Sequence, residues 1–334
     1  MLAGAALACG SFPLPGGPTP VSREIPGTRT LTFDEAYYES PAWSPDGRFL
    51  ATLRSRRWFA DIAPPQSPLG HGPVIIDLVS GDQLTIGSPP TVQPENAYSP
   101  VLWVLGGEAI TFSYSDSSGG QAAPRLVTYR QETKELALGK FCTCAPIALN
   151  GGGSEVLVVG PASDSFQLSW FDLATGRLRS ELSLERSNPR DYRFGNFALS
   201  PDERFLLLDD LQGNVFKYEI GSGEPPAPFL FSAASPAWSP DGGKVAYAKL
   251  QRFGSSSPDY YDGQLVIANA DGSDPEPLFA ETQPAGMLSP TWSPDGTQIA
   301  FLYGDHLSNR ILIAEVPERL RPLGGAVTPT TDGG

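Results

Sequence analysis

The most regular hydrophobic pattern in the chain is a short polar turn that joins two apolar segments. Trp-Ser-Pro-Asp-Gly occurs at residues 43–47, 238–242 and 292–296, and each copy leads into a run of small and large apolar side chains. Proline sets φ for the first central position of a tight turn, and glycine completes the turn without a side-chain clash. The pattern therefore predicts a β-hairpin that is repeated along the chain.

Three further copies are less regular but keep the order of turn and strand. Residues 197–202 read Phe-Ala-Leu-Ser-Pro-Asp, residues 103–112 keep the Trp and the strand after it, and residues 149–158 replace Pro-Asp-Gly by glycines. The residues that precede the six turns are Trp43, Trp103, Leu149, Leu199, Trp238 and Trp292. Their spacing of 39 to 60 positions is close to the spacing of about 40–50 residues that is typical of β-propeller blades.

Each unit also contains a third and a fourth predicted strand. Third strands are predicted at residues 74–78, 125–129, 168–172, 215–219, 265–269 and 311–315, and fourth strands at positions such as 83–86 and 177–180. We therefore expect an all-β fold, a single six-bladed β-propeller of four-stranded antiparallel blades. Residues 28–33 precede the first unit, and we expect this N-terminal strand to close the ring beside residues 311–315, with residues 319–323 as the competing segment.

The repeat divides the chain into three parts. We expect the propeller over residues 28–323, a truncated signal-like or lipoprotein-like segment with a Pro/Gly-rich linker over 1–27, and a disordered tail over 324–334. Residues 1–10 are small and apolar and contain Cys9, which resembles the end of a secretion signal before a lipidated cysteine. Such a signal normally begins with a basic segment, and here that segment would require a start codon upstream of Met1. The alternative is a frayed apolar N-terminus on a cytoplasmic protein.

Composition limits the classes of function. The net charge of −14 disfavours nucleic acid and anionic membrane surfaces, so a membrane is expected as a partner only through a lipid anchor. Two His and three Cys nearly exclude a Cys/His zinc site, and we expect neither a metal nor another cofactor. Cys142 and Cys144 are close in sequence, and a disulfide, two free thiols and a metal pair all stay open.

The repeated motif, followed by runs such as Ile-Ala-Phe at 299–301, resembles the WD40-like repeat of TolB-type β-propellers. The resemblance covers nearly all of residues 28–323 and implies the fold rather than a function. TolB carries an additional α/β domain that residues 1–27 are too short to hold, so its lipoprotein partners are not carried over. Oligogalacturonate lyases share the repeat, but their metal site uses several His, and this chain has two.

The meander order predicts two different faces. The Ser-Pro-Asp-Gly turns lie on one face, which we call the turn face, and the loops after the second and fourth strands lie on the other, the loop face. Long predicted insertions on the loop face carry aromatic and polar residues that are typical of recognition surfaces: Trp58, Tyr98, Tyr192, Tyr260, Tyr261, Asp305 and His306. The alternative is that the aromatic residues pack within their own loops.

Other conspicuous residues are interpreted structurally. The repeated Trp is expected to pack between blades, because it recurs with the hairpin and not with any one site. The Arg54, Arg56 and Arg57 cluster and the acidic segment at residues 209–214 are expected to be solvated loops and turns.

These observations favour a monomeric, non-catalytic propeller that binds a protein, peptide or glycan through its loop face. The candidate lipidation site at Cys9 leads us to expect an extracytoplasmic location, in the periplasm, at the cell surface or on a lipid anchor. No nucleophile elbow or phosphate-binding loop is present in the sequence, and we assign no catalytic residues. Two alternatives stay open: a hydrolase or lyase with scattered residues, including His71 or His306, at the channel mouth, and an accessory propeller of a prolyl-oligopeptidase-type peptidase.

Overall fold

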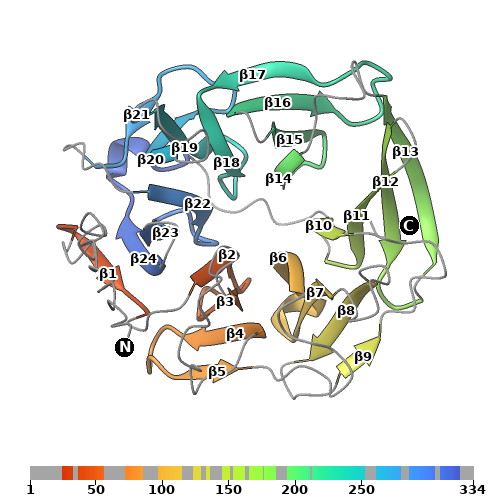
Figure 1. The fold of residues 1–334 in the computed structure, drawn as a ribbon, viewed down its shortest axis with the longest axis horizontal. Coiled ribbons are helices and arrows are strands. Elements are labelled where there is room, and N and C mark those ends of the chain that lie inside the picture. The colour runs from red at the N-terminus through yellow and green to blue at the C-terminus, as the bar shows by residue number, and fades with distance from the viewer. Residues whose placement is uncertain are drawn as a thin grey trace, which may run out of the picture.

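The computed structural model describes residues 25–32, 37–55, 72–85, 97–114, 123–128, 133–135, 145–150, 153–161, 165–175, 177–185, 194–210, 213–252, 261–279, 286–304 and 309–323. In these residues the chain forms six four-stranded antiparallel sheets that surround a central axis (Figure 1). No helix in this part of the chain is long and apolar enough to cross a membrane. The all-β propeller that the repeat predicts is therefore confirmed.

Five of the sheets are meanders of consecutive strands. Blade 1 contains β2 (Tyr37–Trp43), β3 (Phe49–Ser55), β4 (Gly72–Asp77) and β5 (Gln83–Thr85). Blade 2 contains β6 (Ala97–Val104), β7 (Ala109–Tyr114), β8 (Ala123–Thr128) and β9 (Thr133–Glu135), with the short 3-10 helix η2 (Leu105–Gly107) between its first two strands. Blade 3 contains β10 (Ala145–Leu149), β11 (Glu155–Pro161), β12 (Ser165–Asp172) and β13 (Leu178–Glu185).

Blade 4 contains β14 (Phe194–Leu199), β15 (Phe205–Asp210), β16 (Asn214–Glu219) and β17 (Ala227–Phe231). Blade 5 contains β18 (Ala233–Trp238), β19 (Lys244–Arg252), β20 (Tyr261–Asn269) and β21 (Glu276–Pro277). Blade 6 contains β22 (Gly286–Trp292), β23 (Gln298–Gly304) and β24 (Asn309–Glu315), and its fourth strand is β1 (Thr28–Thr30). A last 3-10 helix, η4 (Glu318–Leu320), follows β24.

The N-terminal strand closes the ring. β1 pairs antiparallel with β24, with Arg29 opposite Ile313, and Leu31 N–H donates to Ile311 O at 2.8 Å. The competing C-terminal segment forms η4 instead, and Leu320 of η4 is buried in the apolar cluster that blades 5 and 6 share. The predicted closure is confirmed, and it removes the exposed edge that an open ring would leave.

A hydrogen bond from the repeated tryptophan links neighbouring blades. In four blades the indole N–H donates to a backbone carbonyl on the innermost strand of the preceding blade. The bonds are Trp43 Nε1 to Thr291 O (3.1 Å), Trp103 Nε1 to Ala42 O (2.9 Å), Trp238 Nε1 to Ala198 O (3.2 Å) and Trp292 Nε1 to Ala237 O (3.3 Å). Blades 3 and 4 have Leu149 and Leu199 at this position, and these residues join apolar clusters. The predicted role of the Trp between blades is confirmed.

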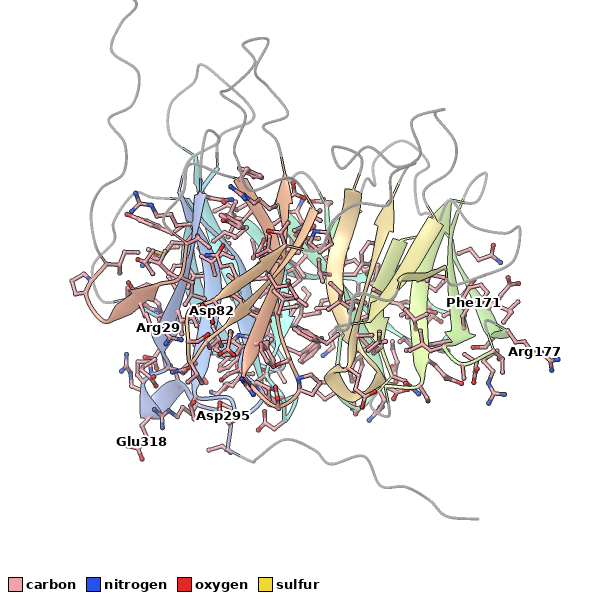
Figure 2. The ribbon with its side chains drawn as sticks, turned by 90° about the horizontal axis from the view of Figure 1, so that it is seen from below. Arg29, Asp82, Phe171, Arg177, Asp295 and Glu318 are labelled. Atoms are coloured by element: carbon pink, nitrogen blue, oxygen red, sulfur yellow. The ribbon has the colours of Figure 1, made fainter. Side chains whose placement is uncertain are left out.

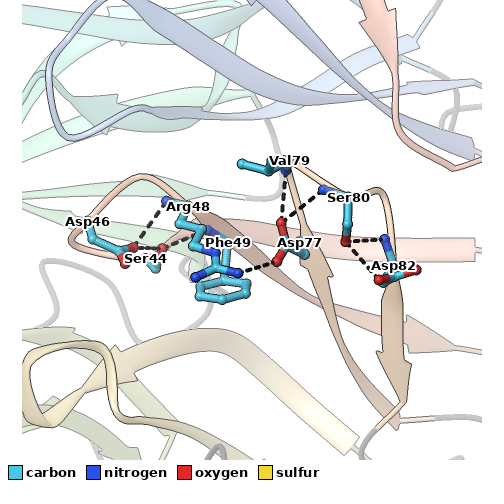
Figure 3. Close-up of polar contacts among 8 residues, drawn as sticks. All are labelled: Ser44, Asp46, Arg48, Phe49, Asp77, Val79, Ser80 and Asp82. Atoms are coloured by element: carbon cyan, nitrogen blue, oxygen red, sulfur yellow. Dashed lines mark hydrogen bonds and ion pairs between the residues drawn. The ribbon is translucent and has the colours of Figure 1, made fainter.

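The Ser-Pro-Asp-Gly turn is held by its own side chains (Figure 3). In blade 1 the Ser44 hydroxyl donates to Asp46 Oδ1 at 2.5 Å and accepts from Phe49 N–H at 2.9 Å. Asp46 Oδ1 also accepts from Arg48 N–H at 3.0 Å. The same serine–aspartate bond recurs in blades 4, 5 and 6.

The irregular third turn keeps this geometry with different residues. Asn150 Oδ1 accepts from Ser154 N–H and from Glu155 N–H, both at 2.9 Å, and Gly153 has a φ of +65°. The Asn150 amide oxygen thus accepts the two backbone N–H bonds that the serine and the aspartate accept in the regular turns. This explains why a blade forms without Pro-Asp-Gly.

Prolines and glycines of successive turns touch around the turn face. Pro45 lies against Gly107, Pro201 against Gly242, Pro240 against Gly296 and Pro294 against Gly47. The φ angles of these four glycines are positive, which favours glycine at each position. An added Cβ would also be crowded by the adjacent blade at Gly107, where it would lie 3.2 Å from Pro45, whereas at the other three glycines it would meet the proline of the adjacent blade at an ordinary contact distance.

We predict that Trp103→Phe weakens the ring. The Ala42 carbonyl loses its indole donor while most of the apolar contact remains, so the free energy of unfolding should fall by about 1–2 kcal/mol. Urea denaturation followed by circular dichroism measures this loss. Val79→Ala, at an exposed position, is the control and should change stability by less than about 0.5 kcal/mol. Equal stability of Trp103→Phe and the wild type would contradict the role of the indole bond.

We also predict that the turns make the protein sensitive to acid. The Ser44 hydrogen bond holds the pKa of Asp46 below its usual 3.8; at Asp295 burial raises the pKa, but bonds from Ser293 and Thr297 outweigh it and the net shift is downward. The unfolded chain therefore binds more protons in acid, so this stabilisation is complete above the usual pKa and is lost as pH falls through the lower folded values.

Urea denaturation at a series of pH values tests this expectation. Between about pH 5 and pH 2 the wild type should lose stability more steeply than Asp46→Asn/Asp295→Asn, which can still accept the turn hydrogen bonds but does not titrate there. Parallel stability curves for the two proteins would contradict the assignment.

Candidate binding site in the central channel

The innermost strands of the blades enclose a cavity of about 300 Å³ on the propeller axis. Residues of β2, β6, β10, β14, β18 and β22 line it, and these are the strands nearest the centre in Figure 1. Pro201, Ser239 and Pro240 also line it, so the cavity extends to the turn face. Figure 2, which views the molecule from the side, shows Asp295 of such a turn at the same end of the molecule as Glu318.

A β-bulge re-aims residues of the innermost strands at the cavity. The pairing register shifts between Glu39 and Ala42 in blade 1, and the register between the first two strands also shifts in each of the other five blades. Three serines at this bulge have positive φ angles: Ser40 (+47°), Ser235 (+51°) and Ser289 (+50°). A residue other than glycine in this conformation costs about 1 kcal/mol or more, and such strain gathers at functional sites. All three serines line the cavity.

A buried carboxylate fixes one side of the channel. Asp209 of β15 is 2% exposed, and it accepts from Asn196 N–H (2.7 Å), Asn196 Nδ2 (2.8 Å) and Ser235 N–H (2.6 Å). Asn196 and Ser235 belong to the innermost strands of two adjacent blades. Asp209 therefore links the innermost strands of two blades by accepting hydrogen bonds from backbone N–H groups of Asn196 and Ser235 that have no partner in their own sheets.

A second polar link joins blades 6 and 1. Asn309 of β24 accepts from Tyr38 N–H at 2.6 Å through Oδ1 and donates to Tyr38 O at 2.8 Å through Nδ2. Its side chain thereby imitates a paired strand, and both residues are buried. Like Asp209, it fixes the position of an innermost strand and so the width of the channel.

Two interpretations of charged segments were wrong. Arg54, expected in a solvated loop, lies in β3 and is 3% exposed; Asp209 and Asp210, expected in a solvated turn, are buried at the end of β15. Both predictions failed because β3 and β15, the second strands of blades 1 and 4, extend beyond the apolar residues from which they were predicted. A partner for a buried charge comes from another segment of the chain, and the local sequence cannot indicate it.

Five of the seven predicted loop-face residues lie outside the described part of the chain: Trp58, Tyr192, Tyr260, Asp305 and His306. The lipidation candidate Cys9 and the cysteines Cys142 and Cys144 also lie outside it. Two lie in strands. Tyr98 is in β6 opposite Ser113, and Tyr261 begins β20 opposite Arg252. Their role in binding stays a prediction. The described residues contain no group of three or more His, Cys, Asp or Glu arranged to hold a metal ion.

The channel serines were missed although the sequence signals them. Ser40, Ser235 and Ser289 each directly precede the Pro-Ala-Trp or Pro-Thr-Trp of their unit. The repeat therefore begins one residue earlier than the pattern of turn and strand indicates. A serine that recurs before a proline in an edge strand indicates a β-bulge at that position.

Comparisons with known proteins agree with this architecture. No family model matches the chain. The Tol-Pal system protein TolB of Coxiella burnetii is 41% identical over 59 residues, which are 18% of this chain and 13% of that protein. TolB of Thioalkalivibrio sulfidiphilus is 33% identical over 73 residues, 22% of this chain and 15% of its own. The matches thus span less than a sixth of these relatives.

Solved structures extend the likeness to most of the chain. A putative TolB from Agrobacterium tumefaciens superposes with a TM-score of 0.56 over 86% of this chain and 94% of its own, at 17% identity. The chain is a TolB-like β-propeller. An oligogalacturonate lyase from Vibrio parahaemolyticus superposes equally well, with a TM-score of 0.56 over 88% of this chain and 94% of its own, at 10% identity. At such identities the TolB-like propeller shares a fold with both.

We predict that Asp209→Asn destabilises the TolB-like propeller. An amide offers one acceptor oxygen where the carboxylate receives three N–H bonds on two oxygens, so at least one buried donor loses its partner. The expected loss in the free energy of unfolding is about 1–3 kcal/mol, measured by urea denaturation. Asp82→Asn, in an exposed turn (Figures 2 and 3), is the matched control and should cost less than about 0.5 kcal/mol. Equal losses would contradict a bridging role for Asp209.

Proposed function

We propose that this TolB-like propeller is a non-catalytic, extracytoplasmic binding scaffold that holds a protein, peptide or glycan at its loop face. The observation that carries the non-catalytic part of the proposal is the character of the channel: every described residue that lines the cavity is uncharged. Acid–base chemistry requires a titratable group beside the substrate, whereas a rigid neutral channel suits recognition.

The way the ring is held together supports a scaffold. The indole bonds, the Asp209 bridge and the Asn309 link each join two blades, and they act on the innermost strands. Blades that are fixed relative to one another present the loops between them in a constant arrangement, and binding residues commonly lie on loops held by a rigid framework.

The extracytoplasmic part of the proposal rests on two observations. The residues around Cys9 have the small, apolar character of a lipidation site, and the matched curated proteins are named as components of the Tol-Pal system.

A pull-down tests the proposal. The full chain is compared, on envelope and secreted fractions, with Trp58→Ala/Tyr260→Ala/Tyr261→Ala. We expect a partner to be retained by the wild type and weakened about tenfold or more in the variant, because interface aromatic residues contribute strongly to binding. Phe231→Ala, on the outer strand β17 and 65% exposed, is the matched control and should retain the partner.

Three results would contradict the proposal. One is equal capture by the triple variant and the wild type, with both folded by circular dichroism. Another is loss of the partner in Phe231→Ala. The third is turnover of a captured substrate, which would make the protein an enzyme rather than a scaffold.

A further inference from the structure

A lysine occupies a position between blades 4 and 5 that is apolar in every other blade. Lys217 of β16 lies opposite Leu207, the third residue of β15. The residues at the same place in blades 1, 2, 3, 5 and 6 are Ile75, Leu126, Trp170, Ile267 and Ile313. The three isoleucines are buried in apolar clusters of the ring. The fold therefore accepts an apolar side chain here and does not require an amine.

Three aromatic rings surround the Lys217 ammonium, and we call them the lysine box. Lys217 Nζ lies 4.1 Å from the ring centroid of Phe205, 5.3 Å from that of Phe229 and 5.4 Å from that of Trp238. Phe205 and Phe229 belong to β15 and β17 of blade 4, and Trp238 belongs to β18 of blade 5, which is the next blade in the ring (Figure 1). A cation within about 6 Å of a ring centroid is attracted by the face of the ring.

Lys217 is weakly bound by polar groups. Its Nζ donates to Ala270 O at 3.4 Å, and among the described residues it makes no other hydrogen bond and no ion pair. An ammonium group has three N–H donors. Two other lysines with described side chains bond more closely, since Lys244 Nζ donates to Asn269 Oδ1 at 2.7 Å and Lys249 Nζ donates to Phe231 O at 2.9 Å.

The lysine box favours the uncharged amine. Burial lowers the pKa of Lys217 below the usual 10.5, and this effect outweighs the carboxylates of Asp271, Asp202 and Glu219, which act in the opposite direction. More of Lys217 is therefore present as free amine near neutral pH than of an exposed lysine. The free amine is the nucleophilic form of the side chain.

A small molecule can reach the amine. Lys217, Phe205, Phe229 and Trp238 are all half-buried, so each keeps part of its surface exposed. The rings offer an apolar surface to a reagent that approaches Nζ, whereas the carboxylates near Lys217 repel an anionic one. The site therefore suits a neutral electrophile.

We propose that Lys217 is a site of covalent modification, at which Nζ is acylated by a neutral acyl thioester. Nζ forms an amide bond to the acyl carbon while the carbon–sulfur bond of the thioester breaks. The sulfur leaves with the electron pair and takes up the proton that Nζ releases, so the products are an acyl-lysine and a thiol. The acylated side chain is uncharged, which suits a position that is apolar in the other blades. Binding at the loop face is not involved, so this proposal and the proposed function can fail independently.

Reaction of the full chain with S-acetyl-N-acetylcysteamine, a neutral thioester, tests the proposal. Mass spectrometry of peptides follows acetylation at each lysine, and Lys244 and Lys249 are controls within the same molecule. At about pH 7.5 Lys217 should react about tenfold faster than Lys249 or more, because each unit by which a pKa falls gives about tenfold more free amine. Its rate should also level off at a lower pH. Equal rates, or the same dependence on pH, would overturn the proposal.

The variant Phe229→Ala opens the lysine box to water. The rate at Lys217 should then level off at a higher pH, closer to that of Lys249, because hydration favours the ammonium. Phe231→Ala is the matched control, since Phe231 lies on the same strand, is 65% exposed and should leave the pH profile unchanged. An unchanged profile in Phe229→Ala, or an equal shift in Phe231→Ala, would contradict activation by the box.

The variant Lys217→Met restores the apolar character of the other blades. Its melting temperature should stay within a few degrees of the wild type, and the fast acetylation should disappear. Lys217→Arg keeps the positive charge between the rings and should lose the fast acetylation as well. Unfolding of Lys217→Met would make the amine structural, and fast acetylation that persists in either variant would place the reaction elsewhere; both results would overturn the proposal.

The natural state of the protein gives a further test. Protein purified from its own cells should carry acyl groups on Lys217 at about tenfold or higher occupancy than on Lys244 or Lys249, measured by mass spectrometry of peptides. Equal occupancy at the three lysines, or none at Lys217, would contradict a modification site.

Discussion

The hydrogen bond from the repeated indole to the carbonyl of the preceding blade is the interaction on which the ring depends. The innermost strand of every blade has one edge paired with its own sheet and one edge turned away from it. An unpaired strand edge is costly when buried and invites aggregation when exposed. The tryptophan satisfies a carbonyl on that edge and fills the space between two sheets at once.

The same constraint explains the other links between blades. Asp209 satisfies N–H groups of Asn196 and Ser235 on two innermost strands, and Asn309 pairs with both backbone groups of Tyr38. On the turn face, proline against glycine brings successive hairpins into contact. Each device acts on the inner part of the ring, where the blades converge and where side-chain volume is most limited.

The ring tolerates irregular copies of the repeat. Blades 2 and 3 lack the Ser-Pro-Asp-Gly turn, yet each forms a four-stranded sheet. Asn150 shows how a blade tolerates this loss, because one amide takes over the bonds of two side chains.

The sequence alone determined the repeat, the strand order, the turns and the closure of the ring, because these depend on local periodicity and on turn residues such as Pro45 and Gly47. The loop-face candidates are likewise predictions from sequence. The buried state of Arg54 and Asp209 was decided only by the tertiary structure, since a buried charge is stabilised by groups distant in the chain. So was the cavity: Ser40, Ser235 and Ser289 are brought together only when β1 pairs with β24 and the blades meet around one axis.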